Sequence, residues 1–177
     1  MDLFLSVVGG IAISPFLVLI ALAIKLESRG PVFFRQNRIG RGGQTIRILK
    51  FRTMVHNAEE VLQTYLRENP ELREEWKADQ KLRNDPRITK VGAWLRKTSL
   101  DELPQLWNVI QGEMSLVGPR PIVDDEIVKY GSAFASYTRV RPGMTGLWQV
   151  SGRNDLSYSQ RVHLDRFYIC NWSTWLD

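Results

Sequence analysis

The sequence predicts an α+β protein that is mostly helical, in which an apolar N-terminal membrane helix is attached to a small polar domain with a short β element. Three observations carry this prediction. Residues 3–24 contain no charged side chain. Apolar residues recur at helical spacing in several later segments, whereas residues 32–51 alternate around a glycine-rich turn. The length of 177 residues suits one domain with an appendage. We therefore assign residues 1–29 to the membrane segment and 30–177 to the polar domain.

The composition excludes several classes of protein. One cysteine rules out an intrachain disulfide framework and a cysteine-cluster zinc site. The two histidines, His56 and His163, are far apart and form no HExxH motif, which argues against a histidine metal centre. No segment is low in complexity, so extended disorder is not expected. Neither a P-loop nor a GxGxxG motif occurs, so a nucleotide-binding fold of those types is unsupported.

The apolar segment is long enough to cross a membrane. A straight helix over its 22 residues would measure roughly 33 Å, against about 30 Å of hydrocarbon. Its flanks lack the basic start and small-residue cleavage site of a signal peptide. Ser14-Pro15 lies at its centre, where the proline removes a helical hydrogen bond and the serine hydroxyl can satisfy the freed group. From these residues alone, a kinked span and a re-entrant hairpin both remain open.

The flank after this segment is strongly basic. Glu27 is the one acid between residues 25 and 52. Positive charge beside a membrane helix predicts that this flank, and the domain after it, lie in the cytoplasm. The same charges favour contact with anionic membrane lipids. The basic residues are Lys25, Arg29, Arg35, Arg38, Arg41, Arg47, Lys50 and Arg52.

The polar domain is predicted element by element. Residues 32–34 and 45–51 alternate around Gly40, Gly42 and Gly43, which indicates a β-hairpin. Apolar spacing then indicates helices over residues 57–68, 71–81 and around 91–95. A helix with a clear apolar stripe follows over 103–110, and then a strand at 114–117. The last elements are a helix over 124–130, a loop region over 139–153 and an amphipathic helix over 157–168.

Asp101 and Glu102 are the strongest candidates for catalysis. Ser99 and Glu102 have the spacing of a capping box, which predicts that both carboxylates lie in the first turn of a helix. Plain capping would explain them without any chemistry. An ionised carboxylate among arginines can instead attack phosphorus, and a neighbouring glutamate can hold Mg²⁺ together with substrate phosphates.

Basic residues around this pair are candidates for binding phosphate. Arg120 lies between two prolines in the motif GPRP, so its backbone has few accessible conformations. An arginine held in this way can bind phosphate through two parallel hydrogen bonds. The other candidates are Arg96, Lys50, Arg52, Arg141 and Arg153.

With these residues in view, the chain resembles the bacterial sugar transferase family, the monotopic phosphoglycosyl transferases. The likeness runs in order along essentially the whole chain and rests on specific motifs. The matching stretches are Ser14-Pro15, GPVFFRQ (30–36), KFRTM (50–54), RKTSLDELPQ (96–105), GEMSLVGPRP (112–121) and RPGMTGLWQV (141–150).

The resemblance implies an activity that spacing alone does not show. Such enzymes transfer a hexose 1-phosphate from a UDP-sugar to undecaprenyl phosphate, which starts O-antigen, capsule or exopolysaccharide assembly. In the family, the aspartate that matches Asp101 forms a covalent phosphosugar intermediate in a ping-pong mechanism, and the glutamate that matches Glu102 assists with Mg²⁺. The arginines that match Arg96 and Arg120 lie near substrate phosphates. The likeness is greatest to members that use UDP-galactose or UDP-glucose.

The resemblance also implies a location. The family's Ser-Pro motif, here Ser14-Pro15, breaks the apolar helix into a re-entrant hairpin in the cytoplasmic leaflet of the bacterial inner membrane. Two departures from the family, the short stretch before the apolar segment and the end at Asp177, indicate part of a longer chain. The sequence leaves open whether the chain forms a homo-oligomer.

A non-catalytic, membrane-anchored protein that binds nucleic acid or another polyanion is the alternative reading, since the formal net charge is +5. The basic residues cluster beside the membrane segment and the carboxylate pair, so we do not expect nucleic acid as a partner. The tryptophans give this alternative little support, because Trp94 and Trp107 fall on apolar helical stripes.

Overall fold

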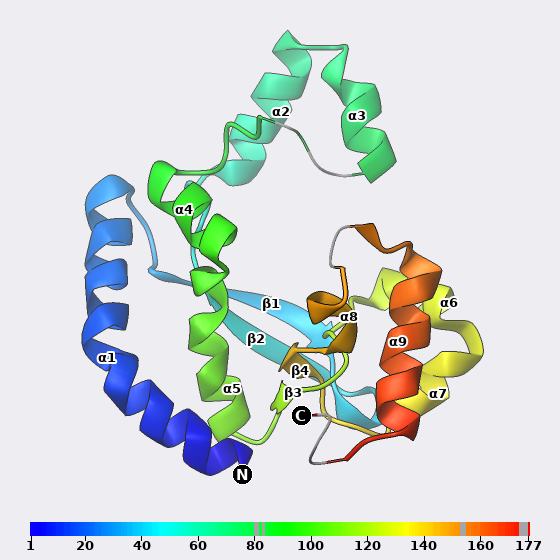
Figure 1. The fold of residues 1–177 in the computed structure, drawn as a ribbon. Coiled ribbons are helices and arrows are strands. Elements are labelled where there is room, and N and C mark those ends of the chain that lie inside the picture. Colours follow the sequence, from blue (N-terminus) through cyan, green and yellow to red (C-terminus); the bar gives the residue numbers. More distant parts are fainter. Residues whose placement is uncertain (80–81, 83, 153–154, 174–176) are drawn as a thin grey trace. The chain divides into compact units, whose positions relative to one another are not determined.

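The computed structural model describes residues 1–79, 82, 84–152, 155–173 and 177. It is a mostly helical α+β structure, as predicted, and its described residues form two small sheets (Figure 1). The chain divides into two compact units. Unit 1 comprises residues 1–14, 35–50 and 104–177, and unit 2 comprises residues 15–34 and 51–103. The predicted division into a membrane segment (residues 1–29) and a following domain (30–177) does not correspond to these two units and stays a prediction.

Helix α1 (Asp2–Glu27) contains the predicted apolar segment. It is long and apolar enough to cross a membrane, and only 11% of its most apolar window is buried within the protein. Phe4 is 70% exposed and Leu19 63% exposed, so the helix is not the core helix of a soluble domain. Its apolar surface therefore needs an apolar environment outside the chain.

The Ser14-Pro15 pair lies within this helix, which continues from Asp2 to Glu27. Pro15 has no amide hydrogen to donate to the carbonyl of Ile11, one turn earlier. The Ser14 hydroxyl donates to that carbonyl at 2.8 Å. The predicted compensation is therefore present: the backbone group that Pro15 leaves unbonded has a partner, as an apolar environment requires.

The predicted hairpin is confirmed as a two-stranded sheet of β1 (Phe33–Ile39) and β2 (Thr45–Phe51). The turn holds a short 3₁₀ segment, η1 (Arg41–Gly43), and is closed by the Gly40 amide, which donates to the Gln44 carbonyl at 2.7 Å. Gly42 and Gly43 have positive φ angles of 71° and 75°, a conformation that glycine adopts without a steric cost.

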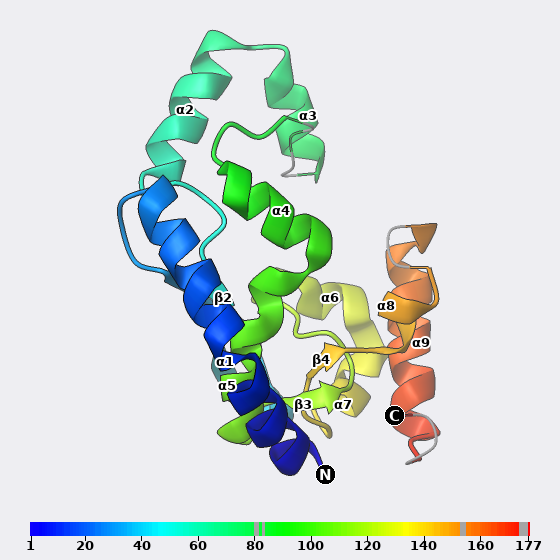
Figure 2. The same ribbon diagram turned by 60° about the vertical axis from the view of Figure 1, so that its left-hand side comes forward.

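Unit 2 contains three further helices that follow the predicted pattern: α2 (Ala58–Glu68), α3 (Leu72–Asp79) and α4 (Lys90–Thr98). Figures 1 and 2 both show α4 beside the C-terminal half of α1. Their contact is a core of Ile20, Ile24, Phe51 and Leu95. A Cβ atom at Gly92 would overlap the Thr53 carbonyl, so only glycine lets α4 approach the chain this closely after β2.

The end of α1 is bound to α4 and to the segment after β2 by polar contacts. The Glu27 carboxylate accepts hydrogen bonds from the amides of Lys90 and Val91, at 2.7 and 3.0 Å. These are two of the amides that a helix N-terminus leaves without an internal partner. Arg52 donates to the carbonyls of Ser28 and Arg29, at 2.8 and 2.6 Å. The chain leaving α1 is thus fixed at three residues.

Unit 1 is built on the short sheet of β3 (Ser115–Val117) and β4 (Gly143–Thr145), which pair in parallel. The strand at 114–117 was predicted, whereas its partner lies in the region predicted as a loop. Further elements of this unit are η3 (Asp124–Glu126), α6 (Ile127–Tyr130), η4 (Gly131–Ala133), α7 (Phe134–Tyr137), α8 (Leu147–Val150) and α9 (Tyr158–Cys170). Helix α9 lies beside α6 and α7 (Figure 1). It begins with a capping box between Ser157 and Gln160.

Unit 1 has two apolar clusters. One packs Ile39 and Ile122 against Tyr130 and Tyr137, and the other consists of Ile48, Val109 and Met114. A polar side chain, Asn108, is buried at 2% exposure beside the second cluster. It accepts from the Leu49 amide at 2.9 Å and donates to the Arg47 carbonyl at 2.9 Å. Asn108 therefore ties α5 (Leu106–Ile110) to β2.

Candidate active site

The Asp101-Glu102 pair lies in unit 2, in a turn that differs from the predicted one. Ser99 was expected to cap the start of a helix with its side chain. Instead it is the last residue of the α4 turn, in the left-handed conformation with φ 57° and ψ 17°. A 3₁₀ segment, η2 (Leu100–Gln105), then precedes α5. The capping box is therefore wrong, although both carboxylates do lie in a first helical turn, that of η2.

The reason is that two helices meet here with no room for a loop. Helix α4 ends at Thr98, and the left-handed Ser99 closes it, because its amide still donates to the carbonyls of Arg96 and Leu95. A non-glycine residue in this conformation costs free energy, and such residues are frequent at functional sites. Asp101 and Glu102 lie two and three residues after Ser99 and are partly exposed.

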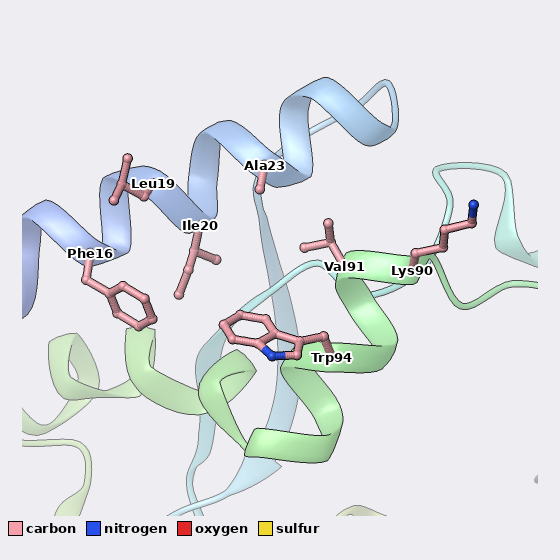
Figure 3. Close-up of a pocket in the computed structure, with 7 residues that line it drawn as sticks. All are labelled: Phe16, Leu19, Ile20, Ala23, Lys90, Val91 and Trp94. Atoms are coloured by element: carbon pink, nitrogen blue, oxygen red, sulfur yellow. The ribbon is translucent and has the colours of Figure 1, made fainter.

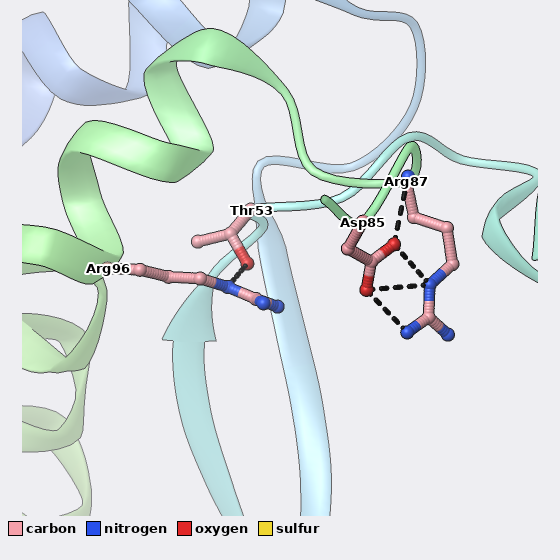
Figure 4. Close-up of polar contacts among 4 residues, drawn as sticks. All are labelled: Thr53, Asp85, Arg87 and Arg96. Atoms are coloured by element: carbon pink, nitrogen blue, oxygen red, sulfur yellow. Dashed lines mark hydrogen bonds and ion pairs between the residues drawn. The ribbon is translucent and has the colours of Figure 1, made fainter. Parts of the chain in front are cut away.

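Arg96, on the last turn of α4, is oriented by Thr53. Its Nε donates to the Thr53 hydroxyl oxygen at 2.8 Å, as Figure 4 shows. Partial burial lowers the pKa of Arg96, while the carboxylates of Asp101 and Asp85 act in the opposite direction. The guanidinium stays charged at any physiological pH. Arg96 thus brings a fixed positive charge into the electrostatic environment of Asp101.

A second charged pair, which the sequence analysis missed, belongs to the same unit. The Asp85 carboxylate accepts from Arg87 Nε at 2.8 Å and from a terminal guanidinium nitrogen at 2.6 Å (Figure 4). Burial tends to raise the pKa of Asp85, but these hydrogen bonds hold it below its usual value. The Arg87 guanidinium also lies 4.8 Å above the centre of the Trp76 ring. The sequence Asn84-Asp85-Pro86 is typical of a turn and by itself gives no sign of this ion pair.

Arg52 and Lys50 were both predicted to bind phosphate. Arg52 is only 7% exposed, and its terminal nitrogens donate to Ser28 and Arg29 at the end of α1. Burial lowers the pKa of Arg52. It has a clear structural role, and its contact with substrate stays a prediction. Lys50 is half-buried on β2, in unit 1, and its role likewise stays a prediction.

Arg120 belongs to unit 1, at the tip of the rigid loop predicted from the GPRP motif. Pro119 and Pro121 are buried while Arg120 is exposed. The loop is attached to β4, because the Gly118 amide donates to Thr145 at 2.9 Å and the Gly143 amide donates to Pro119 at 2.8 Å. The Arg120 guanidinium lies 5.7 Å from the centre of the buried Trp148 ring. The loop thus presents one cation outward from a fixed backbone.

Near Arg120, Asp165 is a buried carboxylate that the sequence analysis did not identify. Asp165 on α9 is 1% exposed and accepts a hydrogen bond from the Tyr130 hydroxyl at 2.7 Å. Burial raises the pKa of Asp165 to about 7, while the Tyr130 bond and the charge and amide of Arg120 act in the opposite direction. The apolar spacing of residues 157–168 predicts a helix that includes Asp165. It does not indicate that this carboxylate is buried.

The remaining predicted residues are two further arginines. Arg141 is exposed in unit 1, just before β4. Arg153 lies outside the residues that the structure describes. The predicted set is thus distributed over both units: Asp101, Glu102, Arg96 and Arg52 are in unit 2, and Lys50, Arg120 and Arg141 are in unit 1.

Asp101 and Glu102 fit one way of holding Mg²⁺. Among the described residues, no three histidine, cysteine or acidic side chains form a group that could hold a metal ion. Mg²⁺ commonly takes only one or two protein carboxylates and completes its coordination with substrate phosphates and water. Two adjacent, partly exposed carboxylates meet that requirement.

Comparison with known proteins gives consistent matches along the chain. A family model described as "Bacterial sugar transferase" matches residues 1–177. The exopolysaccharide production protein ExoY of Sinorhizobium fredii is 52% identical over 176 residues, which cover 99% of this chain and 78% of that relative. The undecaprenyl-phosphate galactose phosphotransferase of Salmonella typhimurium is 49% identical over 176 residues, covering 99% of this chain and 37% of the relative.

A third relative, the UDP-glucose:undecaprenyl-phosphate glucose-1-phosphate transferase of Klebsiella pneumoniae, is 42% identical over 186 residues. The match covers 99% of this chain and 36% of the relative. The chain therefore spans most of the length of ExoY but little more than a third of the length of the two phosphotransferases.

Proposed function

Because this chain belongs to the bacterial sugar transferase family, we propose that it is a phosphoglycosyl transferase that moves a hexose 1-phosphate from a UDP-sugar to undecaprenyl phosphate. The names of the Salmonella and Klebsiella relatives support transfer to undecaprenyl phosphate, and the Klebsiella name supports a UDP-sugar donor. The name of the Sinorhizobium relative supports a role in exopolysaccharide production, and we place the proposed transfer at the start of that assembly. O-antigen or capsule assembly would use the same chemistry.

The observation that carries the mechanism is the arrangement of Asp101 and Arg96 in unit 2. An Asp101 oxygen attacks the phosphorus next to the sugar, the bond from that phosphorus to the bridging oxygen breaks, and UMP leaves with the electron pair. The sugar phosphate is then held on Asp101. In the second step an oxygen of undecaprenyl phosphate attacks the same phosphorus, and the Asp101 carboxylate leaves unchanged.

Electrostatics would do most of the catalytic work in both steps. Arg96, held by Thr53, interacts electrostatically with Asp101 and can neutralise charge on the diphosphate. Arg120 would bind another substrate phosphate from its rigid loop, and the remaining predicted arginines would have the same role. Glu102, with Asp101, would hold Mg²⁺, which supplies charge neutralisation on the diphosphate when bound. A ping-pong order lets one phosphate-binding site serve both substrates in turn.

The experiment that tests this proposal separates the two steps. Incubating the protein with Mg²⁺ and a UDP-sugar radiolabelled in the sugar, without acceptor, should leave label on the acid-quenched protein and release an equal amount of UMP. Adding undecaprenyl phosphate should then move the label into the lipid fraction. A panel of UDP-galactose, UDP-glucose and their N-acetyl forms would identify the sugar. UMP release that occurs only with acceptor present, with no label on the protein, would contradict the two-step mechanism.

The proposal includes the location of the enzyme. Helix α1 enters the cytoplasmic leaflet of the inner membrane, turns at Ser14-Pro15 and returns, so that the rest of the chain lies in the cytoplasm. The exposed apolar surface of α1 and the basic residues after it support this placement. The Ser14 bond to Ile11 supports it as well, because a bend at Pro15 would leave no unpaired carbonyl there.

Cysteine labelling distinguishes this topology from a span. In a Cys170→Ser background, D2C and L26C variants in inverted membrane vesicles should both react with a membrane-impermeant maleimide, because both ends face the cytoplasm. A spanning helix would expose only one of these two positions to the reagent, and labelling of only one would therefore reject the hairpin.

A further inference from the structure

Unit 2 contains an apolar groove between α1 and α4. Its volume is about 440 Å³, and Ile20 and Val91 line it where the two helices approach each other. Phe16, Leu19 and Trp94 complete the apolar part, as Figure 3 shows. These three side chains are 41%, 63% and 47% exposed, so the protein itself does not cover them. In water they would form an unfavourable apolar patch, whereas a hydrocarbon chain would fit along them.

One end of the groove is cationic. Lys90 lines the end opposite Phe16, and Figure 3 shows its ammonium group extending beyond the apolar side chains. Lys25 lies in the last turn of α1, and Arg29 follows the end of that helix. The nearby acid, Glu27, uses its carboxylate to accept from two backbone amides of α4. The groove therefore combines an apolar length with positive charge at one end, which matches a lipid with an anionic headgroup.

We propose that this groove binds one anionic glycerophospholipid, with an acyl chain along Phe16, Leu19 and Trp94 and the headgroup phosphate at Lys90. The site would be separate from the substrate site and would fix α1 against α4 at the membrane surface. It rests on the membrane placement proposed above but not on the transfer reaction.

The position of Lys90 argues against undecaprenyl phosphate as the occupant. Lys90 is the first residue of α4, and Asp101 follows the last residue of that helix. The nine residues of α4 rise about 13 Å from end to end. The phosphate of the acceptor must contact Asp101 to react, whereas the phosphate of a lipid bound in the groove would lie at the far end of the helix.

Fluorescence quenching tests this site. The full chain in nonionic detergent micelles is titrated with phosphatidylglycerol carrying bromine atoms on its acyl chains, which quench tryptophan on contact. Saturable quenching is expected, and it should be several-fold weaker with brominated phosphatidylcholine. Trp94→Phe should remove the saturable component, because Trp94 is the tryptophan that lines the groove.

Two further variants separate the apolar and the charged contributions. Ala23→Phe, at a half-buried residue that lines the groove, should fill it and abolish saturable quenching. Val18→Phe is its control, because this exposed residue of α1 does not line the groove. Lys90→Gln should weaken phosphatidylglycerol binding about fivefold and remove the preference over phosphatidylcholine. Lys129→Gln, an exposed lysine of unit 1, should change neither.

The outcomes decide between occupants. Quenching that never saturates, that is equal for both lipids, or that Ala23→Phe leaves unchanged would overturn the proposal. Full displacement of phosphatidylglycerol by an equimolar amount of undecaprenyl phosphate would also overturn it and would assign the groove to the acceptor. Failure here with successful labelling of the protein by UDP-sugar would reject the lipid site alone. Saturable, selective quenching without labelling would reject the proposed transfer mechanism alone.

Discussion

Asp101→Asn is expected to reduce sugar 1-phosphate transfer by a factor on the order of 10⁴ or more, because an amide cannot form the proposed covalent bond to phosphorus. The loss should affect both steps, so that neither label on the protein nor labelled lipid is detected. Thermal unfolding should stay close to that of the wild type, since Asp101 is partly exposed. The measurement is acid-quenched labelling with UDP-sugar, followed by lipid extraction.

Two other variants make this test specific. Asp125→Asn removes an equally charged, exposed carboxylate from the first turn of η3 and should leave the rate unchanged. Glu102→Gln should lower the rate by about 10²–10³ and raise the Mg²⁺ concentration needed for half-maximal activity, because one of the two expected metal ligands is lost. Undiminished labelling of Asp101→Asn would show that another residue is the nucleophile.

Asp165→Asn is expected to change how the stability of the protein depends on pH. The pKa of Asp165 is about 7 in the folded protein, whereas an unfolded aspartate titrates near 3.8. The folded state therefore holds this proton more tightly, and the wild type loses stability as pH rises from about 4 to 7. Between pH 5 and 8 this loss is on the order of 3 kcal/mol.

Asparagine has nearly the same shape as aspartate and can accept a hydrogen bond from the Tyr130 hydroxyl. It carries no charge, so its burial does not depend on pH. The free energy of unfolding of Asp165→Asn should therefore fall less with pH, so that the variant gains about 3 kcal/mol over the wild type between pH 5 and 8. Denaturant titrations in detergent at several pH values measure this difference. Asp125→Asn is the control, and its free energy of unfolding should change with pH as that of the wild type does. If the free energies of unfolding of Asp165→Asn and the wild type changed equally with pH, the buried carboxylate would not have the raised pKa that the prediction requires.

Local patterns in the sequence predicted much of the secondary structure. The charge-free run predicted α1, the glycine-punctuated alternation predicted the β1–β2 hairpin, and the amphipathic spacing of residues 157–168 predicted α9. Each of these signals depends on residues that are neighbours in the chain. The Asp101-Glu102 pair was found in the same way, from its place in a first helical turn.

Other features depend on residues that are far apart in sequence. The parallel pairing of Ser115 with Gly143 was not predicted, because the three residues of β4 are too few to have a strand pattern of their own. Ser99 was misread because its spacing to Glu102 is that of a capping box, whereas the packing of α4 fixes it as the end of the preceding helix. Asp165 looked like an ordinary polar residue because nothing in its own helix shows that Tyr130 and the Arg120 loop cover it.

The contacts of Glu27 and Arg52 also bear on how this protein could be made soluble. Deleting α1 up to its last residue would remove the acceptor for the amides of Lys90 and Val91. Exchanging the segment that follows it could displace the carbonyls that Arg52 binds in its buried position. Helix α4 carries Arg96 and leads directly into the Asp101 turn. Helix α1 is thus a structural part of the fold around that turn, and expressing the protein without it is expected to destabilise the turn.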